Sequence, residues 1–265
     1  MNDRKSSNEY WESEWEKFDA SDEISLDKRD TKNTLNIVID QILRRIFEKH
    51  KLASGAEFFE VGCGGSRWLP YFSREFGFSV SGLDYTDSGV ASAIAVCARQ
   101  NVQAKIVKGD YERMDELLSK QRFDVVGSFG FVEHFEDTAR CLGFISQIAR
   151  PGGLIVTIIP NMAGVIGWIY KLLKPSVYQI HNPLNLKQMV AARVDIGLEI
   201  VSAEYLLATP GVIGKTRETD TGLFRGCKNV FRLLSHVFWK VELLGWRLPR
   251  SSLLSPYILC VAKRL

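Results

Sequence analysis

The stretch Phe58-Phe59-Glu60-Val61-Gly62-Cys63-Gly64-Gly65-Ser66 decides the fold of this 265-residue chain. An apolar run ends at Val61 and a helical pattern begins near Ser66, so the glycines form the turn between a strand and a helix. Glycine is needed there because the backbone must turn tightly and approach a ligand without a Cβ in the way. The stretch therefore predicts a ligand-binding turn at the end of a buried strand.

The same alternation continues on the C-terminal side of this turn. The apolar runs expected to be strands cover residues 57–61, 79–83, 104–107, 124–128, 154–159, 198–206 and 256–261. The helical patterns cover residues 33–49, 66–76, 89–100, 111–120, 138–149 and 185–196. Buried strands that alternate with crossover helices predict an α/β fold. We expect a Rossmann-like doubly wound sheet, mostly parallel with an antiparallel last strand, and helices on both faces.

Four parts are expected along the chain. They are an N-terminal helical cap (1–52), a core (53–207), an amphipathic basic insertion (208–252) and the last strand of the core sheet (253–265). In the cap, Trp11 and Trp15 are four residues apart and share a helix face. Packing of that face on the core is favoured over the alternative, a flap that covers the ligand site.

Composition and charge indicate the class of protein and its compartment. Apolar residues make up 46% and charged residues 25% of the chain, as in an ordinary soluble globular protein. Residues 1–207 carry 24 basic and 28 acidic side chains, whereas residues 208–265 carry 10 and 3, which suggests an anionic partner near that end. Five widely spread cysteines, no signal peptide and no spanning apolar stretch favour a cytoplasmic protein.

Two residues near the glycine turn distinguish a dinucleotide from a ligand that carries an ammonium group. A dinucleotide-binding fingerprint that starts at Gly62 has its third glycine at position 67, where this chain has Arg67. Glu60, two residues before the first glycine, suits a ligand that carries an ammonium group. With these residues, from about position 52 to 206, the sequence resembles the class I methyltransferases that use S-adenosyl-L-methionine. Ser66 stands at the family's last glycine position.

The resemblance implies a cofactor site at the carboxyl ends of consecutive strands, where open α/β sheets bind ligands. Asp84 would accept both ribose hydroxyls and Tyr85 would pack on the adenine. Asp110 would accept the adenine amino group, and Tyr111 would flank the ring. The predicted cofactor-binding residues are Glu60, Gly62, Gly64, Asp84, Tyr85, Asp110, Tyr111 and Phe129.

Two histidines are candidates for the catalytic base. His134 and His181 stand at positions that resemble active-site histidines of the ubiquinone-biosynthesis O-methyltransferases. For His134, a structural histidine bonded to backbone is an equal alternative, and His181 is the second choice. Some relatives bind a divalent metal through an acidic residue at the position of Gly130. We expect no metal site, because that acid is missing and the adjacent Glu133 and His134 would not share a ligand on a helix.

Two apolar segments, 164–174 and 224–248, stand apart from the strand and helix pattern. In the second, apolar residues recur at helical spacing, and Lys228, Arg232, His236 and Lys240 recur every four residues. The segment is either a lid on the substrate pocket or a contact with an anionic membrane surface. In the second case the protein would lie at the inner face of the membrane.

The sequence thus predicts a methyltransferase that uses S-adenosyl-L-methionine. The expected acceptor is an oxygen of a hydrophobic or lipid-linked small molecule, such as a quinone precursor or a saccharide carrier. Alternatives are an N- or C-methyltransferase of a soluble molecule, a non-catalytic cofactor-binding protein, and a nucleotide-cofactor oxidoreductase, which Arg67 and Glu60 disfavour. Nucleic acid is not expected as a partner, because the basic residues are interleaved with large aliphatic ones.

Overall fold

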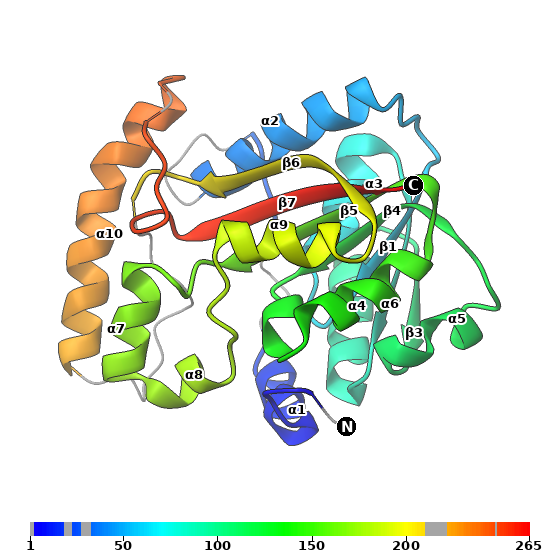
Figure 1. The fold of residues 1–265 in the computed structure, drawn as a ribbon, viewed down its shortest axis with the longest axis horizontal. Coiled ribbons are helices and arrows are strands. Elements are labelled where there is room, and N and C mark those ends of the chain that lie inside the picture. Colours follow the sequence, from blue (N-terminus) through cyan, green and yellow to red (C-terminus); the bar gives the residue numbers. More distant parts are fainter. Residues whose placement is uncertain (1–2, 19–22, 28–32, 210–221, 247) are drawn as a thin grey trace.

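A single seven-stranded sheet forms the centre of the molecule (Figure 1). The computed structural model describes residues 3–18, 23–27, 33–209, 222–246 and 248–265. The strands lie in the order β3-β2-β1-β4-β5-β7-β6. Their bounds are β1 (Glu57–Val61), β2 (Ser79–Asp84), β3 (Ala104–Lys108), β4 (Phe123–Phe129), β5 (Ala149–Pro160), β6 (Leu198–Leu206) and β7 (Tyr257–Arg264).

The directions of the strands confirm the predicted sheet. β1 to β5 pair in parallel, whereas β7 runs antiparallel between β5 and β6. The order reverses at β1, because the chain first winds outward to β3 and then returns to place β4 on the other side of β1. A parallel sheet binds ligands at the carboxyl ends of its strands at such a reversal.

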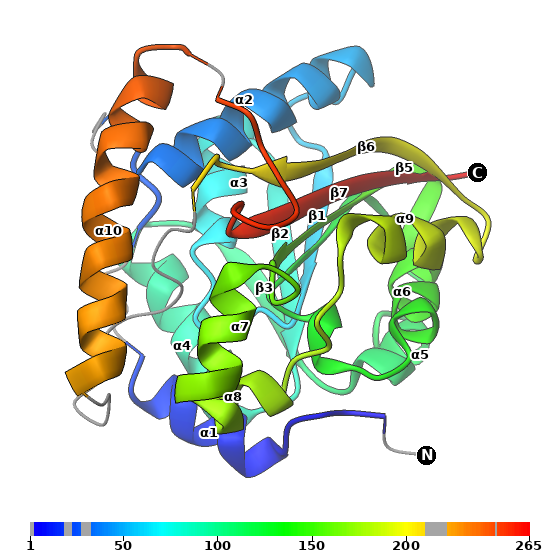
Figure 2. The same ribbon diagram turned by 60° about the vertical axis from the view of Figure 1, so that its left-hand side comes forward.

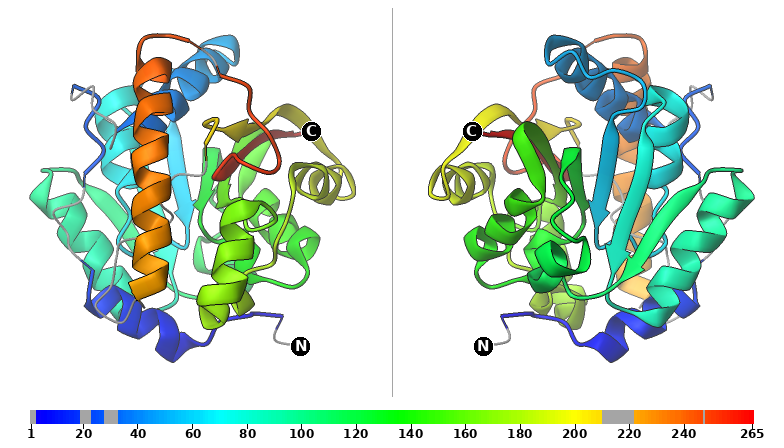
Figure 3. Two further views of the ribbon diagram at one scale, coloured as in Figure 1. Left: turned by 90° about the vertical axis from the view of Figure 1, so that its left-hand side faces the viewer. Right: turned by 90° about the vertical axis from the view of Figure 1, so that its right-hand side faces the viewer.

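Helices cover both faces of the sheet, as predicted (Figures 2 and 3). One face packs against α2 (Thr34–Lys49), α3 (Trp68–Phe76) and α4 (Asp87–Arg99). The other packs against α5 (Met114–Leu117), α6 (Thr138–Gln147) and α9 (Leu186–Val194). Both interfaces are built from fully buried aliphatic and aromatic side chains, so the two helical layers hold the strand ends in fixed positions.

Four of the helices in the described ranges lie outside these two layers. α1 (Asn8–Glu16) lies across the carboxyl ends of the strands, while α7 (Val165–Leu173) and α8 (Pro175–Gln179) follow β5. α10 (Gly222–Leu243) belongs to the predicted insertion and lies beside α7 in all views. The two helices meet in a small cluster of Met162, Ile166, Tyr170 and Phe224. Within the described ranges, no helix is both long and apolar enough to cross a membrane.

Two predicted boundaries differ from the structure. The helix expected over 111–120 is a 3₁₀ turn at Tyr111–Arg113 followed by the short α5. It ends early because Ser119 and Lys120 adopt positive φ angles of 49° and 62°, which no α-helix accommodates. β5 begins at Ala149, so the Pro-Gly-Gly turn expected before the strand lies within its bounds, next to an irregularity in the pairing with β4.

Candidate functional site

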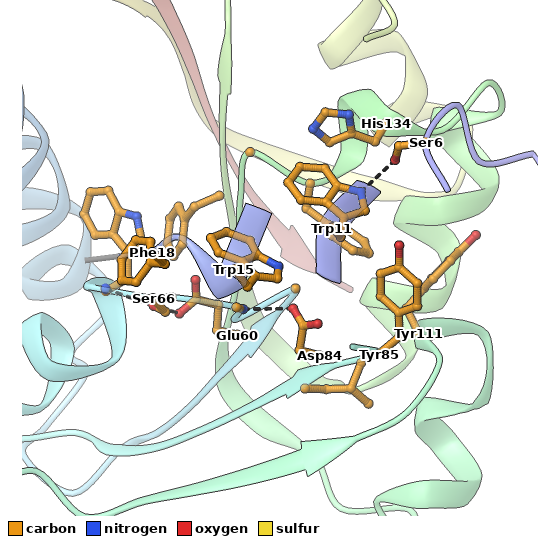
Figure 4. Close-up of a pocket in the computed structure, with 18 of the residues that line it drawn as sticks. Ser6, Trp11, Trp15, Phe18, Glu60, Ser66, Asp84, Tyr85, Tyr111 and His134 are labelled. Atoms are coloured by element: carbon orange, nitrogen blue, oxygen red, sulfur yellow. Dashed lines mark hydrogen bonds between the residues drawn. The ribbon is translucent and has the colours of Figure 1, made fainter. Parts of the chain in front are cut away.

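A cavity of about 220 Å³ lies at the carboxyl ends of β1, β2 and β4, beneath α1 (Figure 4). It brings together most of the residues that the sequence singled out. The predicted residues that line it are Glu60, Gly62, Gly64, Asp84, Tyr85, Tyr111, Phe129 and His134. Asp110 and His181 do not line it.

The glycine turn forms the floor of this cavity. Gly62 has a φ of +73°, and a Cβ there would also clash with the ring of Phe131. A Cβ on Gly64 would lie 2.5 Å from the ring of Trp15. Both positions therefore require glycine, the first for its backbone conformation and the second for the close approach of another group.

Glu60 is the acidic group of the turn. Its side chain is buried, 2% exposed, and accepts a hydrogen bond of 2.5 Å from the hydroxyl of Ser66. Burial raises the pKa of Glu60 to about 8, although the Ser66 hydrogen bond lowers it in part, and the nearby Asp84 raises it further. A cationic group in the cavity would stabilise the ionised carboxylate. Glu60 thus fits the ammonium of the expected cofactor.

Asp84 ends β2 on the neighbouring side of the cavity. One carboxylate oxygen accepts the backbone N–H of Gly64 at 2.8 Å, and the other accepts the N–H and the hydroxyl of Thr86. These bonds fix the carboxylate in one orientation. Burial nevertheless raises the pKa of Asp84. Each oxygen keeps further acceptor capacity, which fits the predicted pairing with two hydroxyl groups.

The expected adenine end of the site includes a residue that the sequence did not indicate. Arg4 pairs with Asp110 at 2.6 Å and lies over the rings of Tyr85 and Tyr111, at 4.5 and 5.6 Å from their centroids. Asp110 therefore has a cationic partner from the N-terminal segment. Both tyrosines line the cavity, and their contact with an adenine ring stays a prediction.

α1 forms the roof of the cavity. Trp11 and Trp15 both line it, and their rings stack at 5.7 Å. Trp15 lies on the glycine turn, and Trp11 makes an edge contact of 4.9 Å with the ring of His134. The sequence left two roles for this helix, packing on the core or covering the ligand site as a flap. The structure favours the flap, because no residue of α1 is fully buried.

The roof is attached on two sides of the cavity. Glu12 accepts hydrogen bonds from the backbone N–H groups of Asp87 and Ser88, at the beginning of α4. On the other side, the N–H of Lys5 donates to the carbonyl of His134 at 2.8 Å. α1 thus bridges the two halves of the sheet above the ends of the strands.

His134 lies at the end of a short 3₁₀ turn, Val132–His134, and is 6% exposed. Its Nδ1 lies 2.7 Å from the carbonyl oxygen of Ile180, which can only accept, so Nδ1 carries the proton. In the neutral ring Nε2 is then an acceptor. Burial and the neighbouring His181 lower the pKa of His134 to about 3, which keeps the ring neutral, although the bond to Ile180 partly opposes this.

His181 lies behind His134 rather than in the cavity. The two rings are 4.6 Å apart, and the Nδ1 of His181 donates to the carbonyl of Val177. Both histidines are therefore bonded to backbone, which was the alternative to a catalytic role. Because each bond uses Nδ1, it also orients the ring and leaves Nε2 as an acceptor.

Glu133 and His134 come close together, although adjacent residues on a helix were expected to point apart. Glu133 lies within 4.0 Å of the Nε2 of His134, and the ligand atoms of Glu133, His134 and His181 all lie within 4.8 Å of one another. A 3₁₀ turn that ends at His134 lets the two side chains converge, as a regular α-helix would not. Burial raises the pKa of Glu133 to about 8. The absence of a metal site remains a prediction.

Comparison with known proteins identifies relatives with the same architecture. Residues 34–202 match the family described as the methyltransferase domain. A ubiquinone biosynthesis O-methyltransferase of Rickettsia bellii is 26% identical over 171 residues, which cover 57% of this chain and 70% of that protein. One from Bradyrhizobium is 31% identical over 105 residues, 39% of each protein.

Solved structures share the fold over nearly the whole chain. A sarcosine dimethylglycine methyltransferase from Galdieria sulphuraria, described as putative, has a TM-score of 0.60 at 12% identity and covers 97% of both chains. The magnesium protoporphyrin IX methyltransferase of Synechocystis, solved with bound S-adenosylhomocysteine, has a TM-score of 0.57 at 12% identity, with 98% of this chain and 95% of that one covered. At such identities the likeness concerns the fold.

Proposed function

This chain belongs to the class I methyltransferases and uses S-adenosyl-L-methionine, and from this premise we propose that it methylates an oxygen atom of a hydrophobic or lipid-linked small molecule. A quinone precursor or a saccharide carrier is the expected acceptor. The ubiquinone O-methyltransferases to which the chain is similar support an oxygen acceptor.

The observation that carries the proposal is the orientation of His134. Its protonated Nδ1 is bonded to Ile180, which leaves Nε2, 4.0 Å from Glu133, as the acceptor nitrogen of a residue that lines the cavity. When bound, the cofactor supplies the methyl group from its sulfonium. The acceptor oxygen would bond to the methyl carbon as the carbon–sulfur bond breaks with both electrons left on sulfur, and the proton of its O–H group would pass to Nε2. A hydroxyl oxygen that gains a methyl group becomes strongly acidic, so even a weakly basic imidazole can accept this proton.

The other predicted residues have binding roles in this proposal. Glu60 pairs with the ammonium of the cofactor, and Asp84 accepts the ribose hydroxyls. Tyr85 and Tyr111 pack beside the adenine. Phe129 and the neighbouring Trp68, whose rings stack at 4.5 Å, form an apolar wall that excludes water from the reacting end.

The proposal also includes where in the cell the reaction takes place. We expect methyl transfer in the cytoplasm at the inner face of the membrane, where a lipid-linked acceptor is found. The support is the charge of residues 208–265, with 10 basic and 3 acidic side chains.

Methyl transfer to a nitrogen or carbon atom is the alternative. The solved structures with this fold include a phosphoethanolamine N-methyltransferase and a geranyl diphosphate C-methyltransferase, so the fold does not select the acceptor atom. An amine acceptor that binds unprotonated needs no base to be methylated. Dependence on His134 therefore distinguishes the oxygen acceptor from such an amine.

The experiment begins with a search for the acceptor. The purified protein is incubated with methyl-labelled cofactor and with lipid or quinone-type extracts, and labelled products are identified by mass spectrometry. We then expect His134→Ala to lower kcat by about 10²–10⁴-fold. Calorimetry should show nearly unchanged cofactor affinity, because the substitution removes a base and not a cofactor ligand.

His50→Ala is the matched control, since His50 lies at the end of α2, away from the cavity, and its loss should leave kcat unchanged. Near-normal turnover of His134→Ala would remove the general base from the proposal. A labelled N-methyl or C-methyl product would contradict the oxygen acceptor itself.

A further inference from the structure

α10 exposes large apolar side chains to solvent along one side. Six of them are between 44% and 72% exposed, although side chains of this kind are normally buried. They occupy a different side of the helix from the buried Phe224 and Ser235. The exposed residues are Leu223, Val230, Leu233, Leu234, Val237 and Phe238.

α7 also exposes apolar side chains. It lies beside α10 (Figure 3). The ring centroids of Tyr170 and Phe224 are 5.2 Å apart. Trp168 and Leu172, four residues apart on α7, are 64% and 59% exposed. We call these two residues and the six of α10 the apolar face. Eight large apolar side chains exposed on two neighbouring helices indicate an interaction site.

Among the described residues of α7 and α10, the exposed charged side chains are all basic. Lys171 on α7 and Arg225, Arg232 and Lys240 on α10 are exposed. Glu242 is the only acidic residue in the sequence of either helix, and its side chain is half-buried. Arg225, Arg232 and Lys240 are seven and eight residues apart, which is about two helical turns each, so they share one side of α10. That side lies next to the apolar residues and does not interrupt them.

We propose that the apolar face docks on the surface of an anionic lipid bilayer. The apolar side chains would enter the headgroup region, while the long basic side chains contact anionic headgroups. Trp168 and Trp246, which follows α10 in the sequence and is 71% exposed, are of the residue type that lies at membrane interfaces. A second copy of this chain fits less well, because it would bring two rows of basic residues together.

The position of α10 in the sequence supports a role separate from the methyl transfer that the family shares. The residues that match the methyltransferase domain end at position 202, whereas α10 begins at Gly222. α7, in contrast, leads through α8 directly to His181, which contacts His134. Docking would thus place the segment that leads to His181 next to the lipid. This inference rests on the proposed function only for the lipid-linked acceptor.

Vesicle flotation tests the docking without any methyl transfer. The probes are phosphatidylcholine vesicles with and without phosphatidylglycerol, at low and high salt. We expect the protein to float with the anionic vesicles at low salt, much less with neutral ones, and weakly at high salt, because salt screens the attraction. Leu233→Ser combined with Val237→Ser should abolish flotation, and Arg232→Glu combined with Lys240→Glu should reduce it at least tenfold.

Matched controls carry the same changes on other surfaces. Ile94→Ser on α4 replaces another exposed aliphatic residue, and Lys105→Glu combined with Lys187→Glu reverses two exposed charges on β3 and α9. These controls should float like the wild type, and all variants should keep the cofactor affinity of the wild type, which shows that they are folded.

Three results would overturn the docking proposal. One is wild-type protein that ignores anionic vesicles at low salt. Another is unchanged flotation of the variant with Leu233→Ser and Val237→Ser. The third is a stable dimer in analytical ultracentrifugation that this variant disperses, because the apolar face would then be covered by a second copy. None of these depends on whether an acceptor is methylated.

Discussion

At the scale of single residues, the buried carboxyl group of Glu60 links cofactor binding to pH. Its pKa of about 8 means that the empty site holds a proton at neutral pH. Between the usual pKa of 4.5 and about 8 the folded protein binds more protons here than the unfolded chain. The contribution of Glu60 to stability therefore falls as pH rises through this window. An ammonium group in the cavity reverses this trend, because it favours the ionised form.

We predict that cofactor binding at neutral pH releases about one proton. Binding must ionise Glu60, so the affinity for S-adenosylhomocysteine should rise about tenfold between about pH 6 and 7. Calorimetry in buffers with different ionisation enthalpies measures the released proton. Glu60→Gln should bind more weakly and lose both the proton release and this slope. A wild-type affinity that does not change over this range would show that the cofactor ammonium lies elsewhere.

Much of the site could be predicted at this scale, because each residue followed a strand whose end the apolar pattern marks. Asp84 and Tyr85 are examples. Arg4 could not be predicted, since it is 106 residues from its partner Asp110 and belongs to no motif. The convergence of His134 with His181 also depends on the path of the chain through α7 and α8, which sequence spacing does not determine.

At the scale of elements, α1 controls access to the cavity. It forms the roof through Trp11 and Trp15 and is attached to α4 through Glu12. The regular spacing of the two tryptophans predicted a helix but could not show which surface it covers. A helix that closes a ligand cavity must move for the ligand to enter or leave.

We predict that Glu12→Ala accelerates cofactor exchange. Without the carboxylate, α1 loses its hydrogen bonds to Asp87 and Ser88 and should open more often. The dissociation rate of S-adenosylhomocysteine, followed by tryptophan fluorescence in stopped flow, should rise several-fold. Glu16→Ala is the control, because Glu16 is exposed on the same helix and should leave the rate unchanged. Equal rates in both variants would show that α1 does not limit exchange.

At the scale of the whole molecule, β7 completes a sheet whose other six strands all precede it in the sequence by 50 residues or more. β7 pairs with β5 on one side and β6 on the other, and Ile258 to Ala262 are fully buried. The apolar run at its position predicted a strand, but the place of that strand between β5 and β6 follows from the sheet topology. The insertion that precedes it begins and ends close together, because Arg250 contacts Glu204 and the carbonyl of Tyr205.

This geometry predicts opposite effects for two deletions. A chain that ends at Pro256 should not fold, because the loss of β7 uncovers two strands and removes five buried side chains from the core. A chain in which a Gly-Ser linker joins Thr209 to Arg250 should fold and bind S-adenosylhomocysteine like the full chain. Its melting temperature should be lower, because Met162, Ile166 and Tyr170 lose the Phe224 side chain, a loss of about 3–5 kcal/mol for a fully buried phenylalanine.

Circular dichroism and thermal unfolding measure the folding of both shortened chains, and calorimetry measures their cofactor binding. Vesicle flotation measures their docking on lipid. The chain with the linker should keep cofactor binding and lose flotation, since the core holds the cavity while α10 holds most of the apolar face. If the chain without β7 unfolded cooperatively and bound the cofactor, β1 to β5 and their helices would be a self-sufficient unit. If the chain with the linker failed to fold, α10 would be part of the core, because its contacts with α7 and α2 would then be needed to hold β6 and β7 in place.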